Sequence, residues 1–169
     1  MTSSIEAASI MPSSDLSKFL RVSRQDRLLL LEAGISLLLA ATAIRVLPFR
    51  VLGRFAARPV HRPAPPTDAR ASKLNRTRWA IGVCARRMPW ARCFQQGLAA
   101  QLMLRRRGIG VTLYYGAAPN QQQGLSAHVW VRDGDIDVVG GEIASAYAVL
   151  ATFPPMGSNE ISGARTPVP

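Results

Sequence analysis

The apolar residues of the chain first gather in a long segment near the N-terminus. Residues 28–47 are apolar almost throughout. Ser23 and Asp26 stand in front of this segment with the spacing of a capping box, which predicts that a helix begins there. A membrane-spanning helix needs about 20 apolar residues, whereas the longest uncharged stretch covers only residues 33–44. We therefore expect the helix to pack on another chain or on the rest of the protein, or to lie in a membrane interface.

A change in composition separates this segment from the next. Residues 56–75 are rich in Arg, Pro and Ala, and proline lacks the donor that a helix or strand requires. We therefore expect an extended linker there. Apolar residues at helical spacing then predict a helix over 77–88, with Trp79 and Val83 turned inward, and Pro89 ends it.

Behind Pro89 the apolar period shortens from that of a helix to that of a strand. A third helix is expected over 93–107, with Gly108 as the residue that ends it. Alternation predicts three strands, over 111–115, 127–132 and 135–139, with a polar loop over 117–124 and a tight turn at Asp133-Gly134. We expect a further helix over 142–150. Helices first and an antiparallel sheet second form an α+β layout.

The length and these elements predict one folded domain with appendages. The expected segments are a loose N-terminus over 1–22, an apolar helical segment over 23–55, the linker over 56–75, the domain over 76–155 and a tail over 156–169.

Composition and charge narrow the function classes. Hydrophobic residues make up 48% of the chain and charged residues 18%, which argues against a disordered protein. The net charge of +11 attracts polyanions. The arginines are scattered, however, and the densest run, 105–107, falls at a helix end, where it offsets the helix dipole. We therefore expect no nucleic-acid partner.

Residues 1–14 lack the basic start of a secretory signal, so we expect a cytoplasmic protein.

Cofactor chemistry is not indicated. The two cysteines and two histidines do not have the spacing of a zinc site. No glycine-rich phosphate-binding motif is present. We expect neither a metal nor a nucleotide cofactor.

Cys93 is the first candidate for chemistry. It stands at the predicted start of a helix, behind Arg92, where unpaired N–H groups and the helix dipole favour the thiolate that attacks carbonyl groups. Cys84 lies mid-helix among apolar residues and has no such help. A lone cysteine is more often a small buried hydrophobe, so Cys93 needs a partner before it counts as a nucleophile.

His128 supplies that partner, because it opens a predicted strand whose Val129 and Val131 would face the core. If Asp133-Gly134 are the central turn residues, Asp137 lies one diagonal step from His128, within about 7–8 Å. A carboxylate there can accept the imidazole N–H and fix its tautomer.

The competing aspartate is Asp135, which shares the predicted face but pairs with Arg132. A slip of one residue in the register would turn both aspartates away.

Helix-borne Cys, strand His and next-strand Asp follow one another in an order that carries a family resemblance. The chain resembles the leader peptidase of lasso-peptide biosynthesis, a bacterial transglutaminase-like family of papain-type cysteine proteases. The resembling runs are residues 85–90, 93–99, 104–109, 113–116, 127–131 and 137–142, with 31–33 and 47–49 in the apolar segment.

The resemblance implies that Cys93, His128 and Asp137 form a triad that removes the leader from a lasso precursor peptide. An ATP-dependent macrolactam cyclase then closes the ring. A separate leader-binding protein is implied, because the chain has no room for that domain. We also expect Trp90 and Trp130 to bind substrate.

Two alternatives stay open. The first is a non-catalytic transglutaminase-like module that holds a leader peptide or a partner protein. The second is a protein that contacts a membrane surface peripherally through the apolar helix and its basic residues.

Overall fold

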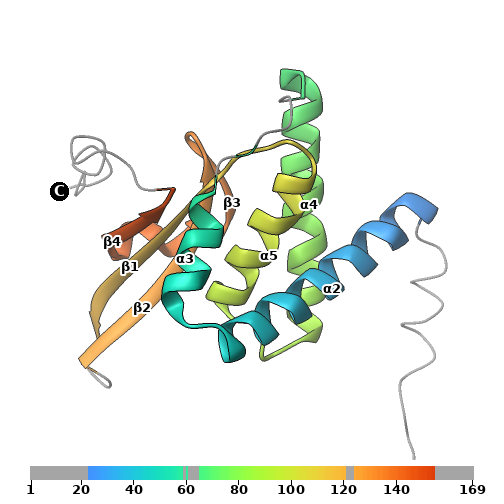
Figure 1. Cartoon of the computed structure of the whole chain (residues 1–169). Coiled ribbons are helices and arrows are strands. Elements are labelled where there is room, and N and C mark those ends of the chain that lie inside the picture. Colours follow the sequence, from blue (N-terminus) through green and yellow to red (C-terminus); the bar gives the residue numbers. More distant parts are fainter. Residues whose placement is uncertain (1–22, 59, 61–64, 121–123, 155–169) are drawn as a thin grey trace, which may run out of the picture.

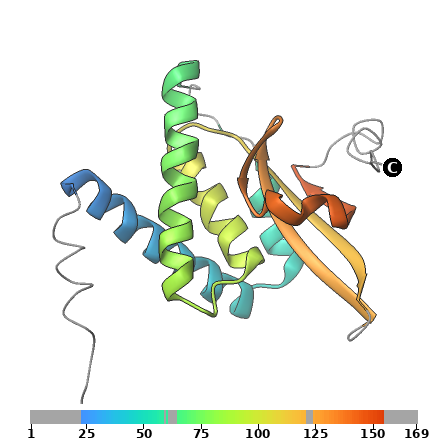
Figure 2. The ribbon, with the colours of Figure 1, turned by 180° about the vertical axis from the view of Figure 1, so that it is seen from behind.

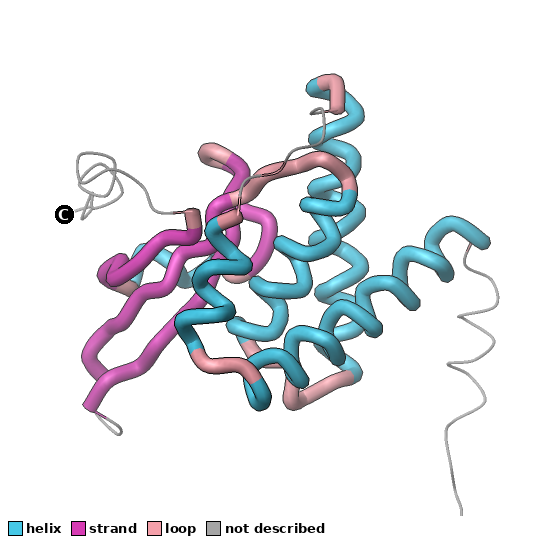
Figure 3. The backbone as a smooth tube through the Cα atoms, in the orientation of Figure 1, coloured by secondary structure: helices cyan, strands magenta, loops and turns pink. Residues whose placement is uncertain are grey.

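Helices and an antiparallel sheet form separate layers in a computed structural model, which describes residues 23–58, 60, 65–120 and 124–154. Figure 1 shows α5 between the sheet on one side and α2 on the other. The tube view in Figure 3 shows the strands gathered together, apart from the long helices. The predicted α+β fold is therefore confirmed. The predicted loose N-terminus, the tail over 156–169 and residues 121–123 of the predicted loop lie outside the described residues. The loop predicted over 117–124 is wrong for residues 117–120, which belong to a strand.

Helix α2 (Arg24–Val46) begins where the capping box predicts. The Asp26 backbone N–H donates to Ser23 Oγ at 3.1 Å, and the Ser23 hydroxyl donates to the Asp26 carboxylate at 2.7 Å. One face of α2 packs on α4 and α5. Its buried residues are Leu29, Leu30, Ala33, Ser36, Leu37 and Ala40. The helix is thus part of the domain core, so the expectation that it packs on the rest of the protein is confirmed.

Two helices begin directly behind prolines. Helix α3 spans Phe49–Ala57 and helix α4 spans Thr67–Arg87, so α4 begins ten residues earlier than expected and takes up much of the predicted linker. Pro48 and Pro66 occupy the N-cap positions of these helices. Proline is tolerated at a helix start, where its missing N–H would have no intrahelical partner. These prolines therefore begin helices instead of preventing them.

Helix α5 (Cys93–Arg106) has the predicted start and ends one residue early. Gly108 follows with φ 76°, and the Ile109 N–H donates to the Leu104 carbonyl at 3.0 Å, which closes the helix as expected. Gly97 lets α5 approach the sheet closely, since a Cβ there would lie 2.8 Å from Val129 Cγ1.

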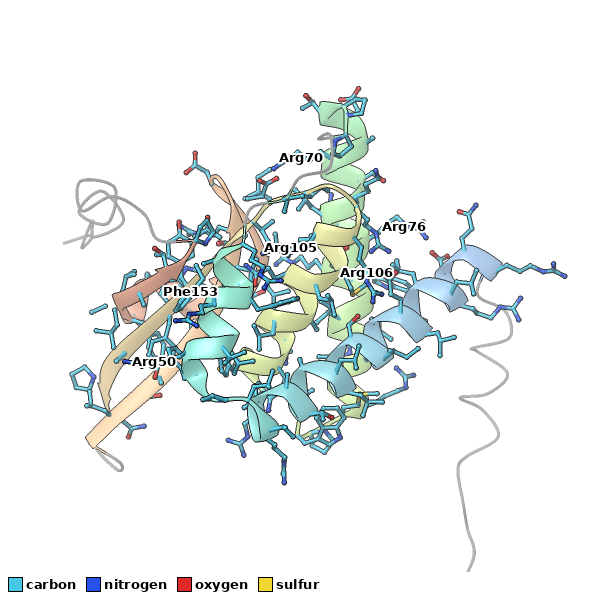
Figure 4. The ribbon with its side chains drawn as sticks, viewed as in Figure 1. Arg50, Arg70, Arg76, Arg105, Arg106 and Phe153 are labelled. Carbon is cyan, nitrogen blue, oxygen red and sulfur yellow. The ribbon has the colours of Figure 1, made fainter. Side chains whose placement is uncertain are left out.

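Arginines tie the helices together. Arg76 of α4 bonds Asp26 at 2.7 Å, and Arg107 bonds Glu32 of α2 at 2.9 Å. Arg105 donates to the Ala56 carbonyl of α3 at 3.1 Å. Figure 4 shows Arg76 and Arg106 beside α2 and Arg105 beside α3. The basic run at the end of α5 therefore makes specific contacts between helices, besides lying at the negative end of the dipole.

Four strands form one antiparallel sheet in the order β3-β2-β1-β4. Their bounds are Thr112–Asn120 for β1, Gly124–Asp133 for β2, Ile136–Val139 for β3 and Ala148–Phe153 for β4. The helix expected over 142–150 is wrong: a short 3-10 helix, η1 (Gly141–Ala146), precedes β4. Pairing with β1 along the open edge of the sheet stabilises residues 148–153 as a strand.

The two faces of the sheet have different cores. Leu113, Val129 and Val131 belong to the main core with α2, α4 and α5. Tyr114 and Trp130 form a second cluster with Ala144 of η1, and the view from behind shows η1 against that face (Figure 2). Alternation along β2 therefore sends His128 toward the side of η1.

Candidate active site

A cavity of about 540 Å³ opens where α4, α5, β2, β3 and η1 meet. Both predicted reactive residues, Cys93 and His128, line it. The other lining residues are Arg78, Trp79, Ile81, Gly82, Arg86, Gln96, Val138, Val139, Gly140, Glu142 and Ile143. The structure thus brings together two residues that lie far apart in the sequence.

Cys93 is the first residue of α5 and is half-buried. The preceding Arg92 makes no side-chain cap, so the N-cap side chain satisfies none of the first N–H groups of the helix. The Gln96 side-chain amide donates to the Ala91 carbonyl at 2.6 Å, which fixes the loop that leads to the cysteine. The helix-start environment predicted for this thiol is present.

His128 is buried and held on several sides. Its Nε2 lies 2.7 Å from the Gly140 carbonyl oxygen. The ring stacks on Trp130 with centroids 6.0 Å apart and lies against Tyr147 at 5.0 Å. A carbonyl can only accept, so Nε2 carries the proton in this arrangement. In the neutral imidazole, Nδ1 is then the nitrogen with a free lone pair.

Gly140 and Gly141 allow this close packing. Gly140 has φ 74°, and a Cβ there would lie 2.7 Å from the Val129 carbonyl oxygen and 3.3 Å from His128 Nε2. A Cβ on Gly141 would lie 2.1 Å from the Asp137 carboxyl carbon. Neither position has room for a side chain, so the chain can pass directly beside the histidine only with glycine here.

The predicted hairpin register is wrong. Asp133 pairs with Ile136, so the central turn residues are Gly134 and Asp135. Gly134, with φ 57°, takes the first of these positions, which favours glycine. The change moves each pairing partner by two residues, and a bulge between Val131 and Arg132 shifts the register again.

Asp137 consequently lies opposite Arg132 instead of Trp130. Its Oδ1 accepts from Arg132 Nε at 2.5 Å. No hydrogen bond joins the Asp137 carboxylate to His128 among the described residues. Asp135, expected to pair with Arg132, is an exposed turn residue. The group that accepts from the imidazole is the Gly140 carbonyl, which a search for titratable side chains does not reveal.

Cys93 and His128 share the cavity without a hydrogen bond between them in the described part of the chain. Cys93 reaches it from the helix layer, and His128 from the opposite face of β2. Catalytic hydrogen bonds often tighten only when substrate binds, so this separation is compatible with the two groups acting together.

The tryptophans differ from expectation. Trp130 is 3% exposed and stacks on Tyr114 at 5.4 Å, so it supports the histidine and has no surface to offer substrate. Trp90 lies in the loop before Cys93 and is exposed, but it does not line the cavity. Trp79, expected to face inward, is 43% exposed and does line it. The longer α4 directs Leu74, Ile81 and Cys84 into the core, which turns Trp79 outward.

The charged residues of the cavity make it cationic. Arg78 of α4 bonds Glu142 of η1 at 3.1 Å, and both side chains are more than half exposed. This pair joins two walls of the cavity. Arg86 also lines it and makes no ion pair with another described residue.

Cys84 offers a contrast within the same chain. Its thiol is buried against α2 and donates to the Leu30 carbonyl at 3.4 Å. Burial raises the pKa of the Cys84 thiol, although nearby Arg87 acts in the opposite direction. This cysteine has the inert character that the sequence predicts.

Metal ligands do not cluster in the part of the chain that the structure describes: no three His, Cys, Asp or Glu residues there could hold an ion together.

Comparison with known proteins adds one finding. The chain has no significant match among curated proteins or among solved structures. A sequence model of the transglutaminase-like superfamily matches residues 38–152, which is more than half of the chain and includes both walls of the cavity. The chain therefore belongs to the transglutaminase-like superfamily.

Proposed function

We propose that the protein is a cysteine peptidase with Cys93 as nucleophile and His128 as general base. The observation that carries this proposal is the shared cavity: a cysteine at a helix start and a histidine with a defined tautomer line the same space. The superfamily, which includes cysteine peptidases, supports it.

The tautomer of His128 defines the proton path. Nδ1 takes the proton of Cys93 Sγ–H, and the thiolate attacks the carbonyl carbon of the scissile peptide bond. The C–N bond breaks as the proton on Nδ1 passes to the leaving amine. Water then gives a proton to Nδ1 and attacks the thioester carbon. The acyl part leaves as a carboxylic acid, and the proton on Nδ1 returns to the sulfur.

The Gly140 carbonyl has the orienting role in this scheme. Accepting the Nε2 proton keeps the ring in position while Nδ1 gains and loses a proton. A neutral carbonyl stabilises the imidazolium less than a carboxylate does, because it carries only a partial negative charge. Asp137, bonded to Arg132, instead holds the strand that leads to Gly140.

We further propose that the substrate is the leader–core junction of a lasso precursor peptide. The runs 85–90, 93–99 and 137–142, which resemble lasso leader peptidases, each contribute residues to the cavity lining and support this choice. A separate leader-binding protein would deliver the precursor, and an ATP-dependent cyclase would close the ring after cleavage.

The test combines three chains. A lasso precursor and a leader-binding protein, taken from reading frames beside this one, are incubated with wild-type protein or with Cys93→Ala. Mass spectrometry should show cleavage at one peptide bond for the wild type and none for Cys93→Ala. Fluorescence anisotropy should show equal precursor binding by both. Cys84→Ala is the matched control and should cleave normally.

Other outcomes of the same test are informative. Tight binding of the precursor by the wild type without cleavage would favour a non-catalytic module. Cleavage by Cys93→Ala would refute the nucleophile.

A further inference from the structure

Helix α2 turns an apolar face away from the protein. Six large apolar side chains on it are 47–71% exposed. These residues, which we call the outer face of α2, are Leu28, Leu31, Ile35, Leu38, Leu39 and Val46. In Figures 1 and 2 one side of α2 packs on the other helices, and no other described helix or strand runs along its opposite side. The helix is about 35 Å long. These side chains therefore form an extended apolar strip, whereas exposed leucines on a protein surface are usually scattered singly.

Cations flank this face at both ends. Arg24 and Arg27 lie at the start of α2 and Arg45 at its end, and none makes an ion pair with another described residue. The two acidic residues of the helix are already engaged, Asp26 by Arg76 and Glu32 by Arg107. The outer face therefore has an apolar centre, cationic ends and no unpaired carboxylate.

The opposite face of α2 limits how such a surface can meet a membrane. The helix is long and apolar enough to span a bilayer by length and composition alone. Spanning would remove Leu29, Ala33 and Leu37 from the core that they form with α4 and α5. It would also break the Glu32–Arg107 ion pair. The fold therefore favours a helix that lies along a surface over one that crosses it.

We propose that the outer face of α2 docks onto an anionic lipid bilayer, with the helix axis parallel to the membrane plane. The leucines would enter the boundary between headgroups and acyl chains, and the arginines at either end would contact lipid phosphates. The net charge of +11 also favours an anionic partner. Because the sheet lies on the far side of α5 from α2 (Figure 1), docking leaves the sheet facing away from the lipid.

A second copy of the chain fits the outer face less well. Both ends of the face are cationic, so pairing two copies in either direction would place arginine against arginine. Such like-charge contacts disfavour association. An anionic surface has no such conflict.

The test is co-sedimentation of the full chain with vesicles, and it does not depend on peptidase activity. Vesicles of equal parts phosphatidylglycerol and phosphatidylcholine should bind the wild type, and pure phosphatidylcholine vesicles should bind it much more weakly. Arg24→Gln with Arg45→Gln should weaken binding about fivefold for each arginine removed. Leu31→Gln with Leu38→Gln should weaken it at least about tenfold for each leucine. Raising the salt to about 0.5 M should also weaken it.

The matched control is Leu125→Gln with Leu150→Gln, which changes two exposed leucines of the sheet and should bind vesicles like the wild type. Failure of the wild type to bind anionic vesicles, or equal loss in the control, would overturn the proposal. Light scattering of the lipid-free protein gives the remaining outcome. A dimer that the Leu31 and Leu38 changes abolish would assign the face to a second copy instead.

Discussion

Cys93 and His128 reach the same cavity from two kinds of support. The cysteine depends on a local feature, the first turn of α5, and on the nearby bond from Gln96 to the Ala91 carbonyl. The histidine depends on residues far along the chain: the Gly140 carbonyl twelve positions later and the Tyr147 ring nineteen positions later. The helix side of the site therefore tolerates changes elsewhere, whereas the hairpin side is sensitive to register, turn geometry and the space around two glycines.

Among the variants that test this comparison, His128→Ala should have the largest effect on leader cleavage. Because nucleophile and base act as a unit, the loss of leader cleavage should nearly equal that of Cys93→Ala. The measurement is single-turnover cleavage of the precursor at saturating enzyme. A circular dichroism melt is the control, since Trp130 and Tyr147 would lose a packing partner. A folded His128→Ala protein with more than about a tenth of wild-type activity would remove the base from the mechanism.

Gly140→Ala should have the next largest effect. Its Cβ would meet the Val129 carbonyl oxygen in a backbone conformation that disfavours alanine, costing about 1–3 kcal/mol of stability. We also expect kcat to fall, because the carbonyl that orients His128 would move. Gly134→Ala is the matched control: it too has positive φ, but nothing lies within 4 Å of its Cβ.

Gly134→Ala should lower the free energy of unfolding by about 1–2 kcal/mol and leave kcat unchanged. Denaturant unfolding and cleavage kinetics separate the two effects. Equal kcat for both glycine variants would show that the Gly140 carbonyl does not orient the base.

Asp137→Asn tests whether the Asp137 carboxylate or the Gly140 carbonyl orients His128. In this structure its carboxylate serves Arg132, and the pair is partly exposed, so stability should change by about 0–1 kcal/mol. Cleavage should stay within roughly tenfold of the wild type. A loss on the order of 10⁴ would mean that Asp137 orients His128 during turnover, as in a triad with a carboxylate. Asp135→Asn, at the exposed turn, is the control and should have no effect.

The smallest expected effect concerns the rate at which the Cys84 thiol is alkylated. A thiol with a raised pKa stays protonated as the pH rises past the usual value, so iodoacetamide should modify Cys84 slowly at neutral pH and faster only in more alkaline solution. Cys93 should react first at neutral pH. Peptide mapping after timed alkylation measures both rates, and faster labelling of Cys84 would contradict the structural contrast between the thiols.

Local signals in the sequence were enough to predict one side of the site. The capping box at Ser23, the helix start at Cys93 and the stop at Gly108 each depend on a few neighbouring residues, and all three are confirmed. The prolines of the predicted linker misled, because Pro66 stands at the start of α4.

The hairpin side needed information that neighbouring residues do not contain. Asp-Gly and Gly-Asp are both acceptable turn pairs, and the choice between them moved Asp137 from His128 to Arg132. Residues 148–153 became a strand through pairing with β1. The Gly140 carbonyl has no side chain by which the sequence could mark it.

The most direct test of the central claim is to trap the acyl-enzyme. Wild-type protein is mixed with precursor and leader-binding protein, quenched in acid within one turnover, and digested for mass spectrometry. The account predicts a thioester that adds the leader mass minus one water to the peptide containing Cys93, with no adduct on Cys84. An adduct on another residue, or cleavage by Cys93→Ala under the same conditions, would contradict it.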